Sequence, residues 1–255
     1  MAEAAQRGHE PETGADDHLE LKRLQDDLDS LHYIVSHDLH APLRTMQEIG
    51  RLLLDNPDTW LPEDTRALVQ HLAQGTAKLC ARTEQLAQYG RVTRQPLKTQ
   101  RVRIADLVSN IAAELASREE HRHVDVVMGT LPDAMGDFGL IREVFAHLIS
   151  NAFKFTRPVA TPRIEIGGVR ESGHVTYHVR DNGVGFDMKY SGRLFGLFQR
   201  LHSEAQFEGL GAGLAIAKRI VERHGGELRA EATAPGGAAF TFSLPAAGDE
   251  SIAAV

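Results

Sequence analysis

Three short segments in the second half of the chain combine amide, carboxylate and amine side chains with closely spaced glycines. They are Asn151-Ala152-Phe153-Lys154-Phe155-Thr156, Asp181-Asn182-Gly183-Val184-Gly185-Phe186 and Gly209-Leu210-Gly211-Ala212-Gly213-Leu214. A carboxylate such as Asp181 can accept a hydrogen bond from an exocyclic amine, and Asn151 offers an oxygen ligand to Mg²⁺. Lys154 can neutralise a phosphate oxygen, and glycines at a helix start turn N–H groups toward phosphate. Together these residue types predict a site for a nucleoside triphosphate.

Each segment has a plainer interpretation when it is taken alone. A Gly-x-Gly-x-Gly run is more often a tight turn, Asn151 can cap a helix end, and Asp181-Asn182-Gly183 can form a turn. No Gly-Lys-Ser/Thr follows the glycines, so this is not a Walker loop. A dinucleotide fingerprint is excluded because no leading βαβ unit precedes the glycines. The occurrence of all three segments in this order favours the triphosphate site.

A further reactive candidate lies near the N-terminus, where His37 is followed by Asp38. A neutral imidazole is a competent nucleophile near pH 7, and an adjacent carboxylate can hold its N–H and stabilise the charge that develops on attack. The chain has 13 histidines, so a surface or packed position is the default for each. That default is retained for His32, His40, His71 and His147.

The elements that must position these residues differ between the two halves of the chain. Leucines recur at three-to-four spacing from Leu19, which predicts a helix that runs through His37 to about Leu54 and bends at Pro42. After a break at Asn56-Pro57, a second helix is predicted over about 62–89. Such a hairpin cannot bury a wide apolar stripe alone, so pairing into a homodimeric four-helix bundle is expected. The alternative is that the hairpin packs on its own C-terminal domain.

The second half mixes the two periodicities and predicts an α+β architecture, a two-layer sandwich with helices on one face of a sheet. Strands are expected at 101–104, 123–128, 163–169, 175–180, 227–230 and 239–244, and helices at 104–117, 138–155 and 213–224. The predicted organisation is a disordered tail (1–16), the helical hairpin (17–90), a linker (91–100), the nucleotide-binding sandwich (101–245) and a flexible tail (246–255).

Composition narrows the class of protein. The content of 42% hydrophobic and 25% charged residues is typical of a globular chain, and the net charge of −7 argues against a general nucleic-acid binder. The single cysteine, Cys80, cannot form an internal disulfide and is expected to be a small side chain that is packed or half-exposed. No apolar run approaches the roughly 18–20 residues of a membrane span, and no signal peptide is recognisable. A cytoplasmic location is therefore expected.

The three segments resemble the ATP-binding domain shared by sensor histidine kinases, type II topoisomerases, a mismatch-repair ATPase and a heat-shock chaperone. The run from Leu194 to His202 contains Phe-x-x-Phe-x-Arg-Leu-His and resembles the lid motif of histidine kinases, especially those of phytochrome-type sensors. The run from Ser36 to Arg44, with its Asp38 and Pro42, resembles the phosphoacceptor box of the same family. The likeness covers about Leu19 to Leu244.

This resemblance implies an ATP- and Mg²⁺-dependent histidine kinase that phosphorylates His37, with Asp38 as its acidic neighbour, and transfers the phosphoryl group to an aspartate of a response regulator receiver domain. It implies that Asn151 binds Mg²⁺, Lys154 contacts phosphate and Asp181 recognises adenine. The residues implied to shape the pocket and its lid are Phe155, Gly183, Gly185, Arg200, Gly209, Gly211, Gly213 and Leu214. The 18 residues before the first leucine stripe are too few for a sensory domain, so either a separate sensor partner or a longer parent protein is expected.

Three positions depart from the pattern of the family. His147 stands where Asn is frequent, one helical turn before Asn151, and Leu210 stands where Thr or Ser is common. Ala41 replaces a Thr or Asn that is thought to orient water for dephosphorylation of the regulator, so weak phosphatase activity is expected.

Two other functions compete with the kinase. One is a non-catalytic dimeric phosphotransfer or scaffold protein with a degenerate ATP fold, against which the retained Asn151, Lys154 and Asp181 argue. The other is an ATPase of the topoisomerase or chaperone kind, which needs no His37-Asp38 on a dimerising hairpin.

Overall fold

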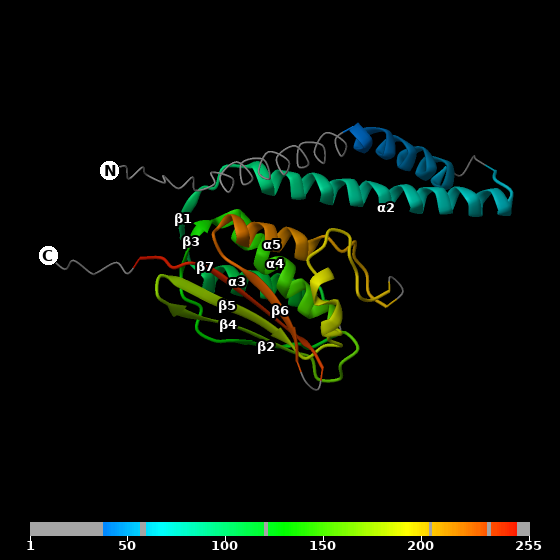
Figure 1. The fold of residues 1–255 in the computed structure, drawn as a ribbon. Coiled ribbons are helices and arrows are strands. Elements are labelled where there is room, and N and C mark those ends of the chain that lie inside the picture. Colours follow the sequence, from blue (N-terminus) through cyan, green and yellow to red (C-terminus); the bar gives the residue numbers. More distant parts are fainter. Residues whose placement is uncertain (1–37, 57–59, 120–121, 204–205, 234–235, 249–255) are drawn as a thin grey trace, which may run out of the picture. The chain divides into compact units, whose positions relative to one another are not determined.

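A computed structural model describes residues 38–56, 60–119, 122–203, 206–233 and 236–248, and Figure 1 shows its fold. The chain divides into two compact units, Met1–Gly90 and Arg91–Val255. The predicted N-terminal tail and His37 lie outside the described residues. Within the described ranges, no helix is both long and apolar enough to cross a membrane.

The first unit contains the predicted helical hairpin. Residues 38–55 are helical and continue through Pro42, and the second helix is α2, Glu63–Arg94, most of which belongs to this unit. The two helices approach closely where Gly50 faces Ala73. A Cβ added to this glycine would lie only 3.2 Å from the Ala73 Cβ. His40 Nε2 also lies 3.5 Å from Glu84 Oε1. Several large apolar side chains remain exposed on this hairpin: Leu39, Met46, Ile49, Leu52, Leu53, Leu68, Leu72 and Leu79.

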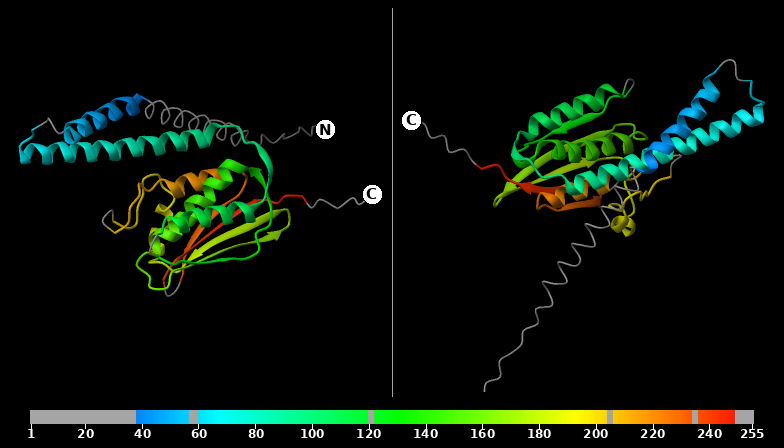
Figure 2. Two further views of the ribbon diagram at one scale, coloured as in Figure 1. Left: turned by 180° about the vertical axis from the view of Figure 1, so that it is seen from behind. Right: turned by 90° about the horizontal axis from the view of Figure 1, so that it is seen from above.

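The second unit is built on a five-stranded sheet of order β2-β4-β5-β7-β6. The strands are β2 (Asp125–Met128), β4 (Arg163–Glu171), β5 (His174–Asp181), β6 (Leu228–Ala232) and β7 (Ala238–Pro245). β2 runs parallel to β4, and every other neighbouring pair is antiparallel. Three helices, α3 (Ile104–Ser117), α4 (Phe138–Phe155) and α5 (Gly213–Arg223), lie on one face of this sheet, as Figures 1 and 2 show. The predicted α+β sandwich is confirmed.

The core lies between the helices and the inner face of the sheet. β7 alternates strictly between buried and half-buried residues, so that Phe240, Phe242 and Leu244 all point inward. The Phe145 ring of α4 meets Tyr177 and Phe242 edge to face, with ring centroids 5.5 and 5.1 Å apart. This packing fixes α4 against the sheet and therefore fixes the residues at its C-terminal end.

Two features near the start of the second unit differ from the sequence-based expectation. A two-stranded sheet pairs β1 (Thr99–Val102) with β3 (Ala134–Asp137), and β3 was not predicted. The helix α2 continues through residues 91–94, which the sequence assigns to a linker. Contacts with the second unit explain why the helix continues. Val92 is buried, and Arg223 of α5 donates hydrogen bonds to the carbonyls of Val92 and of Gln95, the latter at 2.6 Å. At the other end of the unit, Ala246 forms an antiparallel β-bridge to Ala134. The first residue of the predicted flexible tail is therefore hydrogen-bonded to the domain.

Candidate functional site

The C-terminal end of α4 carries the first predicted segment. Asn151, Lys154 and Phe155 are all half-buried and lie on the last turns of the helix. Lys154 Nζ lies 4.3 Å from the centroid of the Phe155 ring. Burial lowers the pKa of Lys154, as do the positive charges of Arg200 and Arg157, while Glu208 acts in the opposite direction. A cationic cluster of this kind suits an anionic ligand, which would offset the mutual repulsion of its members.

The helix end is held in place by Arg122 and Thr156. The fully buried Thr156 hydroxyl donates to Ala152 O at 2.7 Å, which closes the last turn. The Arg122 guanidinium donates to Phe153 O at 2.9 Å and to the Thr156 hydroxyl at 2.7 Å. A cation at this position also complements the negative end of the helix dipole. The end of α4 that carries the predicted site residues is therefore capped by hydrogen bonds and partly buried.

Asp181 ends the central strand β5 with only 4% of its surface exposed. Its Oδ1 accepts hydrogen bonds from the N–H groups of Gly183, at 2.8 Å, and Ala238, at 3.3 Å. Burial raises the pKa of Asp181 to about 6, against the lowering effect of these two hydrogen bonds. A carboxylate in such a poorly solvated place is a strong acceptor for a ligand N–H when it is ionised.

Gly183 brings the second segment against the first. A Cβ at this position would lie 2.5 Å from Phe155 O, so only glycine allows the two backbones to approach this closely. The next residue, Val184, donates its N–H to the same carbonyl at 3.2 Å. The end of β5 and the end of α4 therefore form one continuous backbone surface beside Asp181.

The segment after β5 closes back onto this surface through a histidine that the sequence analysis quoted only as part of the lid motif. The Nε2–H of His202 donates to Gly185 O at 3.0 Å. Its ring also packs with Phe155 and Phe207, with centroids 5.4 and 5.3 Å away, and Phe155 and Phe207 lie 4.9 Å apart. Phe207 was missed, because its aromatic neighbours are up to 52 positions away in the sequence. Figure 1 shows the segment in yellow beside the ends of α4 and α5.

The glycine-rich segment completes the site and leads into α5. Gly211 has φ of +77°, and a Cβ there would lie 2.5 Å from Gln199 O. Gly209 lies against Lys154, whose Nζ would be 3.6 Å from a Cβ at that glycine. Arg200 donates to Phe207 O and so closes the lid segment on itself. Leu214 is half-buried in the first turn of α5.

The structure thus gathers the predicted site residues of the second unit around the ends of α4 and β5, with Arg200 in the lid segment and Gly213 and Leu214 at the start of α5. Asp38 lies in the first unit, exposed on the helix 38–55, and His37 is outside the described residues. The buried carboxylate of Asp181 and the cations around Lys154 fit the adenine and phosphate ends of ATP. Asn151 and the neighbouring His147 fit a divalent cation, because the Nε2 atom of His147 is buried without a hydrogen-bond partner among the described residues.

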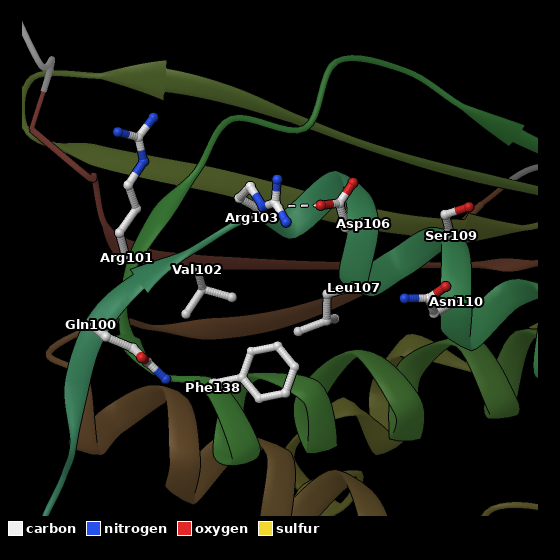
Figure 3. A pocket seen from close by; sticks show the side chains of 9 residues that line it. All are labelled: Gln100, Arg101, Val102, Arg103, Asp106, Leu107, Ser109, Asn110 and Phe138. Atoms are coloured by element: carbon white, nitrogen blue, oxygen red, sulfur yellow. Dashed lines mark ion pairs between the residues drawn. The ribbon is translucent and has the colours of Figure 1, made fainter.

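A pocket elsewhere in the second unit was not predicted. It encloses about 530 Å³ between β1, the start of α3 and Phe138, and Figure 3 shows its lining, including the ion pair of Arg103 with Asp106. Arg101, a second cation of the lining, is paired with Asp133 at 2.8 Å. The pocket shares no residue with the predicted nucleotide site.

Comparison with protein families identifies residues 136–248 as a histidine kinase-, DNA gyrase B- and HSP90-like ATPase domain. The chain is 32% identical to the phytochrome-like protein Cph1 of Synechocystis over 88% of its length, and 34% identical to cyanobacterial phytochrome B of Nostoc over 89%. It is 29% identical to the methanogenesis regulatory histidine kinase FilI of Methanothrix harundinacea over 84%. It spans 30% of each of the two phytochromes and 24% of FilI.

Solved structures show the same fold. Full-length ShkA, solved in complex with AMPPNP, matches 86% of this chain and 46% of its own, with a TM-score of 0.64 and 24% identity. The mycobacterial sensor histidine kinase MprB matches 58% of this chain and 97% of its own, with a TM-score of 0.50 and 25% identity. The match to ShkA extends over both units, whereas the match to MprB covers little more than half of the chain.

Proposed function

Because residues 136–248 are a histidine kinase-type ATPase domain and the chain around them matches the catalytic core of sensor histidine kinases, we propose that this protein is an ATP-dependent histidine autokinase of a two-component system. It phosphorylates His37 and passes the phosphoryl group to an aspartate of a response regulator receiver domain. The observation that carries the proposal is the convergence of buried Asp181, half-buried Lys154 and the close-packed glycines at one end of the second unit.

In this proposal the two ends of the site bind different parts of ATP. Asp181 accepts the N–H of the adenine amine, and Phe155 with His202 forms an aromatic wall beside it. Lys154 and the N–H groups around Gly209 and Gly211 contact the phosphates. Asn151 would hold Mg²⁺, which would supply positive charge against the phosphate oxygens.

The phosphoryl acceptor belongs to the first unit. The His37 imidazole attacks the terminal phosphorus, and the Asp38 carboxylate holds the ring N–H and stabilises the positive charge that forms. The exposed leucines of the hairpin support assembly with a second copy into a four-helix bundle, which buries them. A separate sensor protein, or a sensory region in a longer parent protein, would supply the signal.

The autokinase is tested by incubating the protein with Mg²⁺ and ATP that carries label on its terminal phosphate. The expected product is protein-bound label that is lost in acid and retained in base, as phosphohistidine is. His37→Gln should abolish the label while nucleotide affinity, measured by calorimetry, stays within about twofold of the parent, because the two sites lie on separate units.

The competing functions give other outcomes. Steady release of inorganic phosphate without protein-bound label would indicate an ATPase. Absence of both ATP binding and label would indicate the non-catalytic scaffold. Label that persists on His37→Gln would place the phosphoacceptor elsewhere.

A further inference from the structure

A carboxylate lies among the cations at the predicted phosphate end of the site. Glu208 directly precedes Gly209, the glycine that lies against Lys154. Its Oε1 accepts a hydrogen bond from the Arg157 guanidinium at 2.7 Å. This ion pair joins the lid segment to the residues that follow α4, across 51 positions of the sequence. The Glu208 side chain is 71% exposed, so packing does not hold the carboxylate in this place.

The Glu208 carboxylate acts on more than its hydrogen-bond partner. Burial lowers the pKa of Lys154, and the charges of Arg200 and Arg157 lower it further, whereas the charge of Glu208 raises it. Opposite charges attract over several ångströms in a partly buried site, so Glu208 offsets the repulsion among these three cations. A side-chain carboxylate of the protein therefore lies where the electrostatics suit a phosphate oxygen.

The Arg157 guanidinium has a second acidic neighbour that is better shielded from solvent. Its NH2 group lies 3.7 Å from Oε1 of Glu119, which in turn pairs with Arg122 at 3.4 Å. The side chains of Glu119 and Arg122 are both only 18% exposed. Exposed ion pairs contribute little to stability, so the Glu208 partner can be exchanged at low cost while Glu119 keeps the guanidinium near the end of α4.

We propose that Glu208 is a placeholder for nucleotide phosphate: its carboxylate competes with the triphosphate for the Arg157 guanidinium and thereby lowers the affinity of the site for ATP. This inference rests on the nucleotide site of the proposed function. When the nucleotide binds, Arg157 exchanges the carboxylate for a phosphate oxygen and becomes a phosphate ligand beside Lys154. The exchange favours the nucleotide, because a triphosphate carries more negative charge than a carboxylate and guanidinium groups bind phosphate in a bidentate manner.

The test measures the binding of AMPPNP and of adenosine by calorimetry, in Mg²⁺ and at constant ionic strength. Glu208→Gln should bind AMPPNP about three- to tenfold more tightly than the parent, because the amide keeps the shape of the side chain without its charge. Adenosine has no phosphate, and its affinity should stay within about twofold. Glu208→Asp retains the charge and should bind AMPPNP more weakly than Glu208→Gln. A purely structural role of Glu208 would alter the affinity for both ligands.

A double-mutant cycle tests whether Arg157 is the group for which the carboxylate competes. Arg157→Gln should weaken AMPPNP binding about three- to tenfold. In that background the gain from Glu208→Gln should shrink to about twofold or less. Glu227→Gln is the matched control, because Glu227 also pairs with an arginine, Arg229, at 2.7 Å and is similarly exposed. Glu227 follows the end of α5 that is remote from the glycine-rich segment, so its variant should leave AMPPNP affinity unchanged.

The outcomes separate this inference from the proposed function. Equal AMPPNP affinity in the parent and Glu208→Gln proteins would overturn the placeholder and leave the nucleotide site intact. A gain of the same size with and without Arg157 would also overturn it, because the carboxylate would then not compete for that guanidinium. A Glu208-dependent gain in a protein that binds AMPPNP but forms no phosphohistidine would support the placeholder and contradict the autokinase.

Discussion

Asp181 is almost completely enclosed, and its ionisation is costly for that reason. Its pKa of about 6 in the folded protein compares with 3.8 as the ordinary value. Between these two pH values the folded state holds a proton that the unfolded state has released. The free energy of unfolding therefore decreases as pH rises from about 4 to 6 and stays lower above that. The cost at neutral pH is on the order of 2–3 kcal/mol at most.

Asp181→Asn should relieve this cost and impair the site at the same time. The amide oxygen can still accept from Gly183 and Ala238, so urea denaturation at pH 7.5 should show a gain of about 1–3 kcal/mol over the parent, and none at pH 4. Adenine nucleotide affinity at pH 7.5 should drop about ten- to a hundredfold, because a charge-assisted hydrogen bond is lost. An equal stability change at both pH values would mean that the carboxylate charge is not the cause.

The residue types at this site could be predicted from the sequence, but their environments could not. Asp181, Lys154 and the glycines are recognisable by type and spacing. The burial of Asp181 depends on β7, whose Ala238 lies 57 positions later and donates to the carboxylate. His202 and Phe207 were not identified as parts of the site, because their contacts with Phe155 and Gly185 arise only when the lid segment folds back.

At the scale of the elements, α4 connects the core to the site. Its middle turns pack on the sheet through Phe145, and its last turn is capped by Thr156 and Arg122. Hydrophobic periodicity located this helix correctly, as it located α3 and all of α5, whose end it placed one residue too late. The strand β3 was missed because Ala134-Met135-Gly136-Asp137 has no β-branched residue and is defined by its pairing with β1.

Arg122→Leu should therefore loosen the end of α4 that carries Asn151 and Lys154. The substitution removes the donors to Phe153 O and to the Thr156 hydroxyl, at a cost of about 1–3 kcal/mol in thermal or urea unfolding. Nucleotide affinity should fall as well. The matched control is Arg118→Leu, whose exposed ion pair with Glu114 should contribute less than about 1 kcal/mol. Equal losses in the two variants would show that the cap has no special role.

At the scale of the whole molecule, the two units differ in how far they bury their apolar residues. The second unit encloses its own core around Phe145, Tyr177 and Phe242, which is why its fold class could be read from the mixed periodicity of the sequence. In the first unit Leu68 and Leu72 are 69% and 62% exposed. An exposed apolar surface of this kind is typical of a face that another protein surface covers. The sequence could indicate this apolar stripe, but not what covers it.

Replacing both leucines with glutamate should convert a dimer to a monomer in sedimentation, since charges in an apolar bundle core are strongly disfavoured. Nucleotide affinity should remain close to that of the parent, because the ATP-binding unit has a separate core. Gln74→Glu adds charge at an exposed polar position of the same helix and should leave the dimer intact. A parent protein that is already monomeric at micromolar concentration would contradict the bundle.

The hydrogen bonds between α5 and the end of α2 determine where the chain can be cut to obtain the second unit alone. Arg223 donates to the carbonyls of Val92 and Gln95, and Arg219 donates to the Thr93 hydroxyl at 3.3 Å. A fragment that starts at Arg101, where the sequence alone would place the boundary, strips these donors of their acceptors and removes the buried Val92 side chain. We therefore expect a fragment that begins at Arg91, the first residue of the second compact unit, to be more stable than one that begins at Arg101, since the last turn of α2 packs as part of the domain that follows it.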